Sequence, residues 1–379
     1  MAVIDARVRP SGRRRGRGSA VGWIVGLGGG LALAGTLVGL AATVEAQAAV
    51  GRSPVSAALH DVAWVAIATA MGWVSFVVVR RAGLERVLAW SPVLLAAALA
   101  GLGAVMVPGL GTTVGGAERW IPVGPFQIQP SEFAKLALVL YLAKLVTSRP
   151  SERVLGPVLV VTAVTAGAIF IEPDMGTALV VAAIGAGALV VARVPLRRLA
   201  PIALTGGGLA TLAAFSSAYR RARLLSFLHP WRYRASLSYQ EVQALGSFAT
   251  AHVTGSGLGA GLANWGYVPN AVTDFVMTLV VQDFGVIGAL GVIAALGGII
   301  LGLLALAERT PMSGAHAVAV LVAVWLAAQT LLNLGAVVGL LPVTGVPLPF
   351  VSQGGSSLVV EAIALGVVLA SVHRGERRR

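Results

Sequence analysis

The sequence predicts an all-α protein with many membrane-spanning helices, and three observations point to this fold class. Of the 379 residues, 57% are hydrophobic and only 11% are charged, and the mean hydropathy is +0.86. The apolar residues fall in blocks long enough to cross a bilayer, which takes about 20 residues per helix. Most of the arginines lie between or beyond these blocks. A soluble domain is about one quarter charged, so the composition excludes that class, and its hydrophobicity excludes a disordered chain.

We expect a single membrane domain at residues 20–372, preceded by a basic, disordered arm at 1–19 and followed by a basic tail at 373–379. The domain should contain about ten transmembrane helices, with one large extracytoplasmic loop, residues 218–273, between the seventh and the eighth. Many blocks are rich in Gly and Ala, which allow membrane helices to approach closely. The expected helices are 20–46, 57–79, 87–108, 131–148, 154–172, 174–193, 196–217, 274–306, 313–340 and 354–372.

The distribution of arginine sets the expected orientation. With ten spans, both ends of the chain lie on one side of the membrane, and that side carries 19 Arg against 7 on the other. Positively charged loops remain in the cytoplasm, so we expect a multi-pass membrane protein with both termini cytoplasmic. The basic ends then serve orientation and contact with anionic lipids, and we expect no nucleic acid as a partner.

The large outer loop, 218–273, carries a net charge of +4. Arginine suits phosphate because its planar fork makes paired, charge-assisted hydrogen bonds, and the interleaved apolar and aromatic residues indicate a segment at the membrane surface. We therefore expect a site for a phosphorylated lipid. The alternative is a tolerated basic loop, since long loops can escape the orientation rule. The loop arginines are Arg220, Arg221, Arg223, Arg232 and Arg234.

Ionisable residues at the membrane are costly and are candidates for function. Glu132 and Lys135 are three residues apart on one face of the fourth span, either as a structural ion pair or as a pair that lines the substrate cavity. Asp174 is placed to cap the next helix. Asp274 lies where the outer loop re-enters the membrane, either as a helix-start residue favoured by the dipole or as a general base with a raised pKa.

Other catalytic motifs are absent from the sequence. There is no Cys, the five His show no metal-ligand spacing, and no motif of lipases, zinc proteases or ATP-driven pumps occurs, so no protein metal site is predicted. The glycine-rich stretch 255–266 lacks the preceding strand that a dinucleotide site needs. We expect it to be a glycine turn that supports the outer loop.

Several blocks occur in a characteristic order between about residues 111 and 365: GAERWIPVGPFQIQPSEFAKLALVLYLA (116–143), EPDMGTALVV (172–181), RARLLSFLHPW (221–231), SYQEVQALGS (238–247), GSGLGAG (255–261), VPNAVTDF (268–275) and NLGAVVGLLPVTGVPLPFVSQGGSSLV (333–359). In these blocks the chain resembles the shape, elongation, division and sporulation family, the group of RodA and FtsW. The resemblance implies a ten-helix protein of the bacterial cytoplasmic membrane that polymerises lipid II into peptidoglycan and works with a class B penicillin-binding protein.

The resemblance also implies roles for individual residues. Asp274 would be the catalytic base of an inverting transfer, with polyprenyl diphosphate as the leaving group. A divalent cation, Mg²⁺ or Mn²⁺, is a candidate cofactor from the family and from diphosphate chemistry, with no organic cofactor. The residues expected to bind the substrates, lipid II and the lipid-linked glycan, are Arg119, Trp120, Glu132, Lys135, Arg221, Arg223, Tyr239, Gln240, Gln243, Ser352, Ser356 and Ser357.

The chain departs from the family pattern in places near the expected base. Two other functions therefore stay open: a flippase or transporter of the same lipid precursor, and a non-catalytic scaffold that recruits the transpeptidase. A transporter often shows inverted repeats, which the sequence lacks. The departures are Glu172 for Gln, Asn270 for Glu, Val272 for His, Gln282 and Asp283 for two Glu, and Gln353 for Tyr.

Overall fold

The computed structural model describes residues 15–49, 54–114, 117–215, 218–265 and 267–375. Ten long helices correspond to the ten expected spans: α1 (Arg15–Ala49), α2 (Pro54–Ala82), α3 (Leu84–Val105), α4 (Pro130–Ser148), α5 (Leu155–Ile171), α6 (Met175–Val191), α7 (Leu196–Phe215), α10 (Val276–Glu308), α11 (Gly314–Val337) and α12 (Gly355–Gly375). The protein is an all-α polytopic membrane protein.

Six of the described helices are long and apolar enough to cross a membrane, namely α1, α2, α3, α10, α11 and α12. The helices α5 and α6 are apolar but shorter. A helix suits the bilayer because it satisfies its backbone hydrogen bonds internally. Small residues bring neighbouring helices together: a Cβ atom at Gly366 of α12 would lie 2.3 Å from the carbonyl oxygen of Gly72 in α2.

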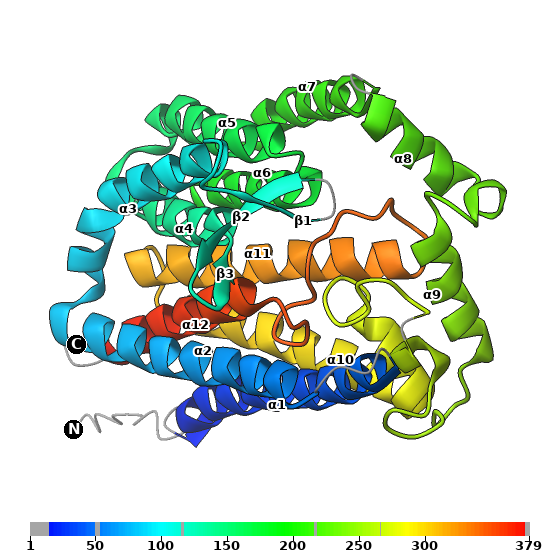
Figure 1. Cartoon of the computed structure of the whole chain (residues 1–379). Helices are drawn as coiled ribbons and strands as arrows, with labels where there is room; N and C mark the ends of the chain where they lie inside the picture. Colours follow the sequence, from blue (N-terminus) through cyan, green and yellow to red (C-terminus); the bar gives the residue numbers. More distant parts are fainter. Residues whose placement is uncertain (1–14, 50–53, 115–116, 216–217, 266, 376–379) are drawn as a thin grey trace, which may run out of the picture.

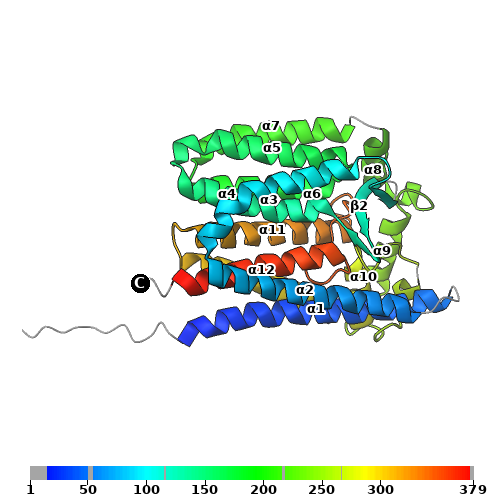
Figure 2. The same cartoon turned by 60° about the vertical axis from the view of Figure 1, so that its left-hand side comes forward.

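The helices run roughly side by side, and the connecting segments separate into two ends (Figures 1 and 2). In Figure 2 the start of α1 and the end of α12 lie at one end of the bundle, and the large loop lies at the other. That loop contains α8 (Ala218–Leu228), α9 (Tyr239–Thr250) and the 3₁₀ turns η2 (Pro230–Tyr233) and η3 (Leu262–Trp265). A further 3₁₀ turn, η1 (Ser151–Arg153), precedes α5.

The expected helices leave residues 109–130 unassigned, and the structure places a small sheet there. Its strands β1 (Thr112–Val114), β2 (Ala117–Val123) and β3 (Phe126–Ile128) are antiparallel in the order β1-β2-β3. Thr112 pairs with Trp120 and Ile121 with Ile128. Its contacts with α3, α4 and α12 hold β2, which carries Arg119, at the end of the bundle that also carries the large loop (Figure 2).

The expected ends of the chain are only partly described. Residues 1–14 of the basic arm and 376–379 of the tail lie outside the described residues. The first helix begins at Arg15 rather than residue 20, and the last continues to Gly375 rather than ending at 372.

Candidate active site

Asp274 lies two residues before α10, in a tight turn of the connecting segment. The backbone N–H groups of Thr273, Asp274 and Phe275 all donate to the carbonyl of Asn270, at 3.2, 3.1 and 3.3 Å. Asn270 has a φ of +51°, a left-handed conformation that Asn tolerates better than most residues. The asparagine that replaces the usual glutamate therefore suits the turn that presents Asp274.

Two other segments hold the backbone around Asp274. The side chain of Asn333 in α11 donates to the Asp274 carbonyl at 2.8 Å and to the Val346 carbonyl at 2.8 Å. Ser352 donates its hydroxyl to the carbonyl of Thr273, and the N–H of Gln353 donates to the carbonyl of Val272 at 2.9 Å. We call residues 343–354 the closing loop. Asp274 is thus fixed by both a helix and this loop.

Two arginines and one further carboxyl, that of Asp174, lie close enough to Asp274 to influence its ionisation. A Cβ atom built on Gly345 of the closing loop would lie 3.6 Å from Asp274 Oδ2 and 3.9 Å from Arg119 Nη1, so both groups approach the same glycine. Arg119 donates through Nε to the Glu172 carbonyl at 3.0 Å and through Nη2 to the Pro173 carbonyl. The resemblance alone had indicated Arg119, and the structure brings it to Asp274.

Asp174 starts α6 as the sequence predicted. Its Oδ1 accepts from the backbone N–H of Thr177 at 3.0 Å, which confirms the capping role. Its Oδ2 accepts from Gln129 at 3.4 Å. Asp174 is close enough to Asp274 and Glu172 to influence the ionisation of both. We call Arg119, Glu172, Asp174, Arg223 and Asp274 the carboxylate–arginine cluster.

Asp274 and Glu172 both lie in connecting segments, and they differ in their ionisation. Burial and then the charge of Asp174 raise the pKa of Asp274 to about 6, against the opposing charges of Arg119 and Arg223. Burial and Asp174 likewise raise the pKa of Glu172 to about 8. At neutral pH, Asp274 is therefore mainly ionised and can accept a proton, whereas Glu172 is mainly neutral.

The outer loop contributes its arginines unequally. Arg223 of α8 donates through Nη1 to the Val343 carbonyl at 3.1 Å, which joins α8 to the closing loop beside the cluster. Arg221 lies on the same helix and is exposed. The side chain of Arg220 lies outside the described residues.

The other expected substrate residues of the outer loop lie on α9. Gln240 donates to the carbonyl of Pro269 at 2.7 Å and so holds the segment that leads to Asp274. Tyr239 is exposed and Gln243 is half-buried. Trp120 is half-buried in β2, where its carbonyl accepts from Thr112. Contact of these residues with a substrate stays a prediction.

Glu132 and Lys135 form the ion pair of the first alternative, with Lys135 Nζ 2.8 Å from Glu132 Oε1 and side chains only 0–1% exposed. Lys135 also donates to Gln329 of α11 at 2.9 Å. Gln329 in turn donates to Glu361 of α12 at 2.9 Å and to the Pro347 carbonyl at 3.0 Å. We call Glu132, Lys135, Gln329 and Glu361 the core network.

The core network supports the closing loop through hydrogen bonds. Glu361 accepts from the backbone N–H of Phe350 at 2.8 Å and from the hydroxyl of Ser357 at 2.8 Å. Phe350 has a φ of +61°, which is strained for an aromatic residue and needs such support. Ser356 accepts from the Gln129 N–H and donates to the Gln127 carbonyl. The expected serines therefore all make internal hydrogen bonds, and substrate contact by them or by the buried pair stays a prediction.

Sequence reasoning missed three polar residues that hold this site: Asn333, Gln329 and Glu361. Glu361 is 1% exposed and Gln329 is fully buried. Glu361 is a lone carboxyl in the apolar run LVVEAIAL. It could have been found as Glu132 was, because an ionisable residue within a membrane helix is energetically costly and is therefore a candidate for function. The amides carry no charge and give a weaker signal.

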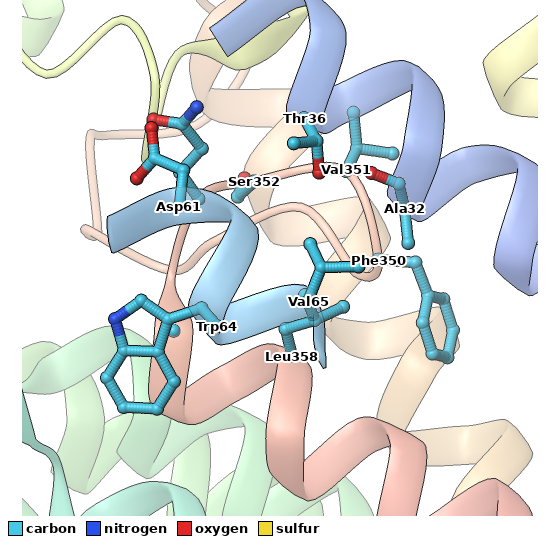
Figure 3. Close-up of a pocket in the computed structure, with 11 residues that line it drawn as sticks. Ala32, Thr36, Asp61, Trp64, Val65, Phe350, Val351, Ser352 and Leu358 are labelled. Carbon is cyan, nitrogen blue, oxygen red and sulfur yellow. Dashed lines mark hydrogen bonds between the residues drawn. The ribbon is translucent and has the colours of Figure 1, made fainter. Parts of the chain in front are cut away.

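A small cavity lies beside the closing loop (Figure 3). Thr36 of α1 and Asp61 and Trp64 of α2 line it together with Phe350 and Ser352. The helices α1 and α2 therefore lie beside the closing loop, the loop that binds the backbone at Thr273. Asp61, which the sequence analysis did not select, faces the closing loop here.

Comparisons with known proteins agree with this architecture. The model of the FtsW, RodA and SpoVE family, described as cell cycle protein, matches residues 27–378. The probable peptidoglycan glycosyltransferase FtsW of Alcanivorax borkumensis is 36% identical over 351 residues, covering 89% of each chain. The protein of the same name from Pseudoalteromonas translucida is 34% identical over 281 residues, covering 72% of this chain and 70% of the relative.

Two solved structures are similar over nearly the whole chain. One chain comes from work on the structural coordination of polymerization and crosslinking by a peptidoglycan synthase complex, with a TM-score of 0.74, 27% identity, and coverage of 95% of this chain and 98% of that one. The other is the rod shape determining protein RodA of Thermus thermophilus, with a TM-score of 0.67, 26% identity, and coverage of 92% and 95%. The chain therefore belongs to the FtsW, RodA and SpoVE family of cell cycle proteins.

Proposed function

We propose that the protein is a peptidoglycan glycosyltransferase that polymerises lipid II, with Asp274 as the general base. The enzyme class is that of its curated relatives, which are 36% and 34% identical over most of the chain. The observation that carries the catalytic proposal is the position of Asp274, half-buried beside Asp174 and between Arg119 and Arg223.

In the proposed reaction, the donor is a glycan on polyprenyl diphosphate and the acceptor is the 4-hydroxyl of the lipid II sugar. Asp274 takes the hydroxyl proton while the oxygen attacks the anomeric carbon. The bond from that carbon to the diphosphate oxygen breaks, and its electrons leave with the diphosphate. Attack opposite the α-linked leaving group gives a β-linkage, as inverting chemistry requires. The proton on Asp274 then passes to water.

The arginines would stabilise the leaving diphosphate. Preorganised donors placed where charge develops lower the barrier, and Arg223 is fixed by its hydrogen bond to the closing loop. We assign the leaving-group charge to Arg223 and its neighbours. A divalent cation remains a proposal from diphosphate chemistry, because the described residues contain no group of three His, Asp or Glu side chains that could hold one. No step above uses it.

We also propose the setting of the reaction. The excess of arginine at the end that carries both termini supports a cytoplasmic location for them, with the carboxylate–arginine cluster on the outer side. The similarity to a chain of a peptidoglycan synthase complex supports a class B penicillin-binding protein as the partner.

The test is polymerisation of lipid II by the purified protein together with its transpeptidase partner. We expect Asp274→Asn to lower the rate by about 10²–10⁴-fold, the usual contribution of a general base, with an unchanged yield of folded protein. The matched control is Glu85→Gln, which changes an exposed carboxylate at the start of α3. Glycan chains of normal length and rate from Asp274→Asn would remove this residue from catalysis. Flipping of lipid II without polymerisation by the wild type would favour a transporter.

A further inference from the structure

The helix α10 is broken at Gly285, where φ is 68° and ψ is −163°. The break leaves carbonyls without helical partners, and part of the outer loop supplies the donors. The N–H of Ser256 donates to the Gln282 carbonyl at 2.8 Å, and the N–H of Gly257 donates to the Asp283 carbonyl at 3.0 Å. The outer loop is thereby joined to a membrane helix through its backbone.

The same contact continues beyond the break. The N–H groups of Val286 and Ile287 donate to the carbonyls of His252 and Val253, each at 3.3 Å. The approach leaves no room for a side chain: a Cβ atom on Gly285 would lie 2.3 Å from the Val253 carbonyl oxygen. Residues 252–257 therefore lie directly on the backbone of α10.

Two side chains of α10 extend this contact along the loop. Gln282 Oε1 accepts from the backbone N–H of Ala263 at 2.7 Å. Asp283 Oδ1 accepts from Asn264 Nδ2 at 2.7 Å, and its carboxylate also faces the N–H groups of Gly259 and Gly261. The side chains of Gln282, Asp283 and Asn264 are all buried. We call residues 255–264 the glycine loop.

We propose that Gln282 and Asp283 are positioning residues, which fix the glycine loop and through it the segment that carries Asp274. This inference rests on the proposed function of Asp274. Asn264 is tied to α10 through Asp283, and the chain returns to the start of the same helix directly after Asp274. The intervening segment is therefore closed at both ends on α10, which limits the conformations that Asp274 can adopt.

The contact with the glycine loop includes two positions that depart from the family pattern. Where two glutamates are usual, this chain has the amide Gln282 and the shorter acid Asp283. The structure pairs the amide with a backbone N–H and the acid with the Asn264 amide. Gln282 Oε1 and Asp283 Oδ1 each accept from a donor of the glycine loop, so both positions keep an acceptor oxygen in this contact.

The test combines hydrogen exchange with kinetics in the full-length protein and its transpeptidase partner. In Asp283→Ala we expect amides of residues 255–275 to exchange at least about tenfold faster. We expect kcat for lipid II polymerisation to fall about tenfold, since small misplacements of a reacting group cost up to about 10²-fold, with KM within about twofold. The exchanged pair Asn264→Asp with Asp283→Asn restores an amide–carboxylate hydrogen bond and should recover both protection and kcat.

The control is Leu290→Val, which trims an exposed side chain of the same helix beyond this contact and should change neither readout. Unchanged exchange in Asp283→Ala and Asn264→Ala would overturn the anchor. Faster exchange with unchanged kcat, or a loss of activity that only follows a loss of folded protein, would overturn positioning. Failure of the proposed function is seen separately, as normal polymerisation by Asp274→Ala, because the exchange measurement needs no activity.

Discussion

The core network and the carboxylate–arginine cluster contain the same kinds of groups in different surroundings. In the core network, Lys135 and Glu132 are fully buried and paired with each other, and Lys135 also donates to Gln329. In the cluster, Glu172 and Asp174 are buried, but Asp274 is half-buried and Arg223 is exposed. The first region is enclosed among the helices, whereas the second has an exposed arginine that a substrate can reach.

The hydrogen bonds between these regions show how the core network can support the backbone beside Asp274. The core network supports the closing loop at Pro347 and Phe350, and the same loop binds the backbone at Thr273 through Ser352. The family resemblance implies that the Glu132–Lys135 pair is important. The pair can have this importance through its support of the closing loop, without contacting lipid II. A residue can be essential because it fixes a loop that fixes the base.

The largest expected effect is the loss of the buried ion pair in Lys135→Met. The change leaves Glu132 buried without its cation and should destabilise the fold by about 3–5 kcal/mol. Thermal unfolding in detergent and polymerisation per folded molecule would be measured together. We expect a lower melting temperature, and an activity per folded molecule that falls much less than in Asp274→Asn.

The matched control replaces both charges, as in Glu132→Leu with Lys135→Met. Removing a buried pair entirely is often close to neutral, so the double variant should recover most of the lost stability. A stable Lys135→Met protein that binds lipid II normally but cannot polymerise it would place the pair in the chemistry and break the distinction between the two regions.

The next effect is the pH dependence of the reaction. A general base must be unprotonated, and the pKa of Asp274 is raised to about 6. Below that pH the base is increasingly protonated, so kcat/KM should fall about tenfold for each pH unit and should level off above it. Initial rates between pH 4.5 and 8 would test this. A flat profile down to pH 4.5 would mean that Asp274 is not the group that accepts the proton.

The elements of the fold were also unequally predictable from the sequence. Ten helices follow from ten apolar blocks, because hydrophobic length is a local property of the chain. The small sheet was missed because β1 and β3 have only three residues each. The helices α8 and α9 were missed because the outer loop was read for its charge and not for its periodicity.

The site shows the same limit. Asp274 and Arg223 could be selected locally, since charge at a membrane surface is expensive or suited to phosphate. The partnership of Lys135 with Gln329 joins residues 194 positions apart, and no local pattern contains it. Arg119 was indicated only by resemblance, because its function depends on a turn at Glu172 and Pro173 that a single sequence does not place beside it.

The smallest expected effects separate Arg221 from Arg223, two of the arginines of α8. Arg223 is held by the closing loop and lowers the pKa of Asp274, whereas Arg221 is exposed. Arg223→Ala should therefore weaken binding of a polyprenyl diphosphate by about tenfold or more, as a lost hydrogen bond to a charged group would, and should move the pH of half-maximal rate upward. Arg221→Ala should weaken binding less and leave that pH unchanged. Binding to vesicles with and without the diphosphate lipid would measure both. Equal effects would assign the loop a general attraction for anions, in which case neither arginine is a specific part of the cluster.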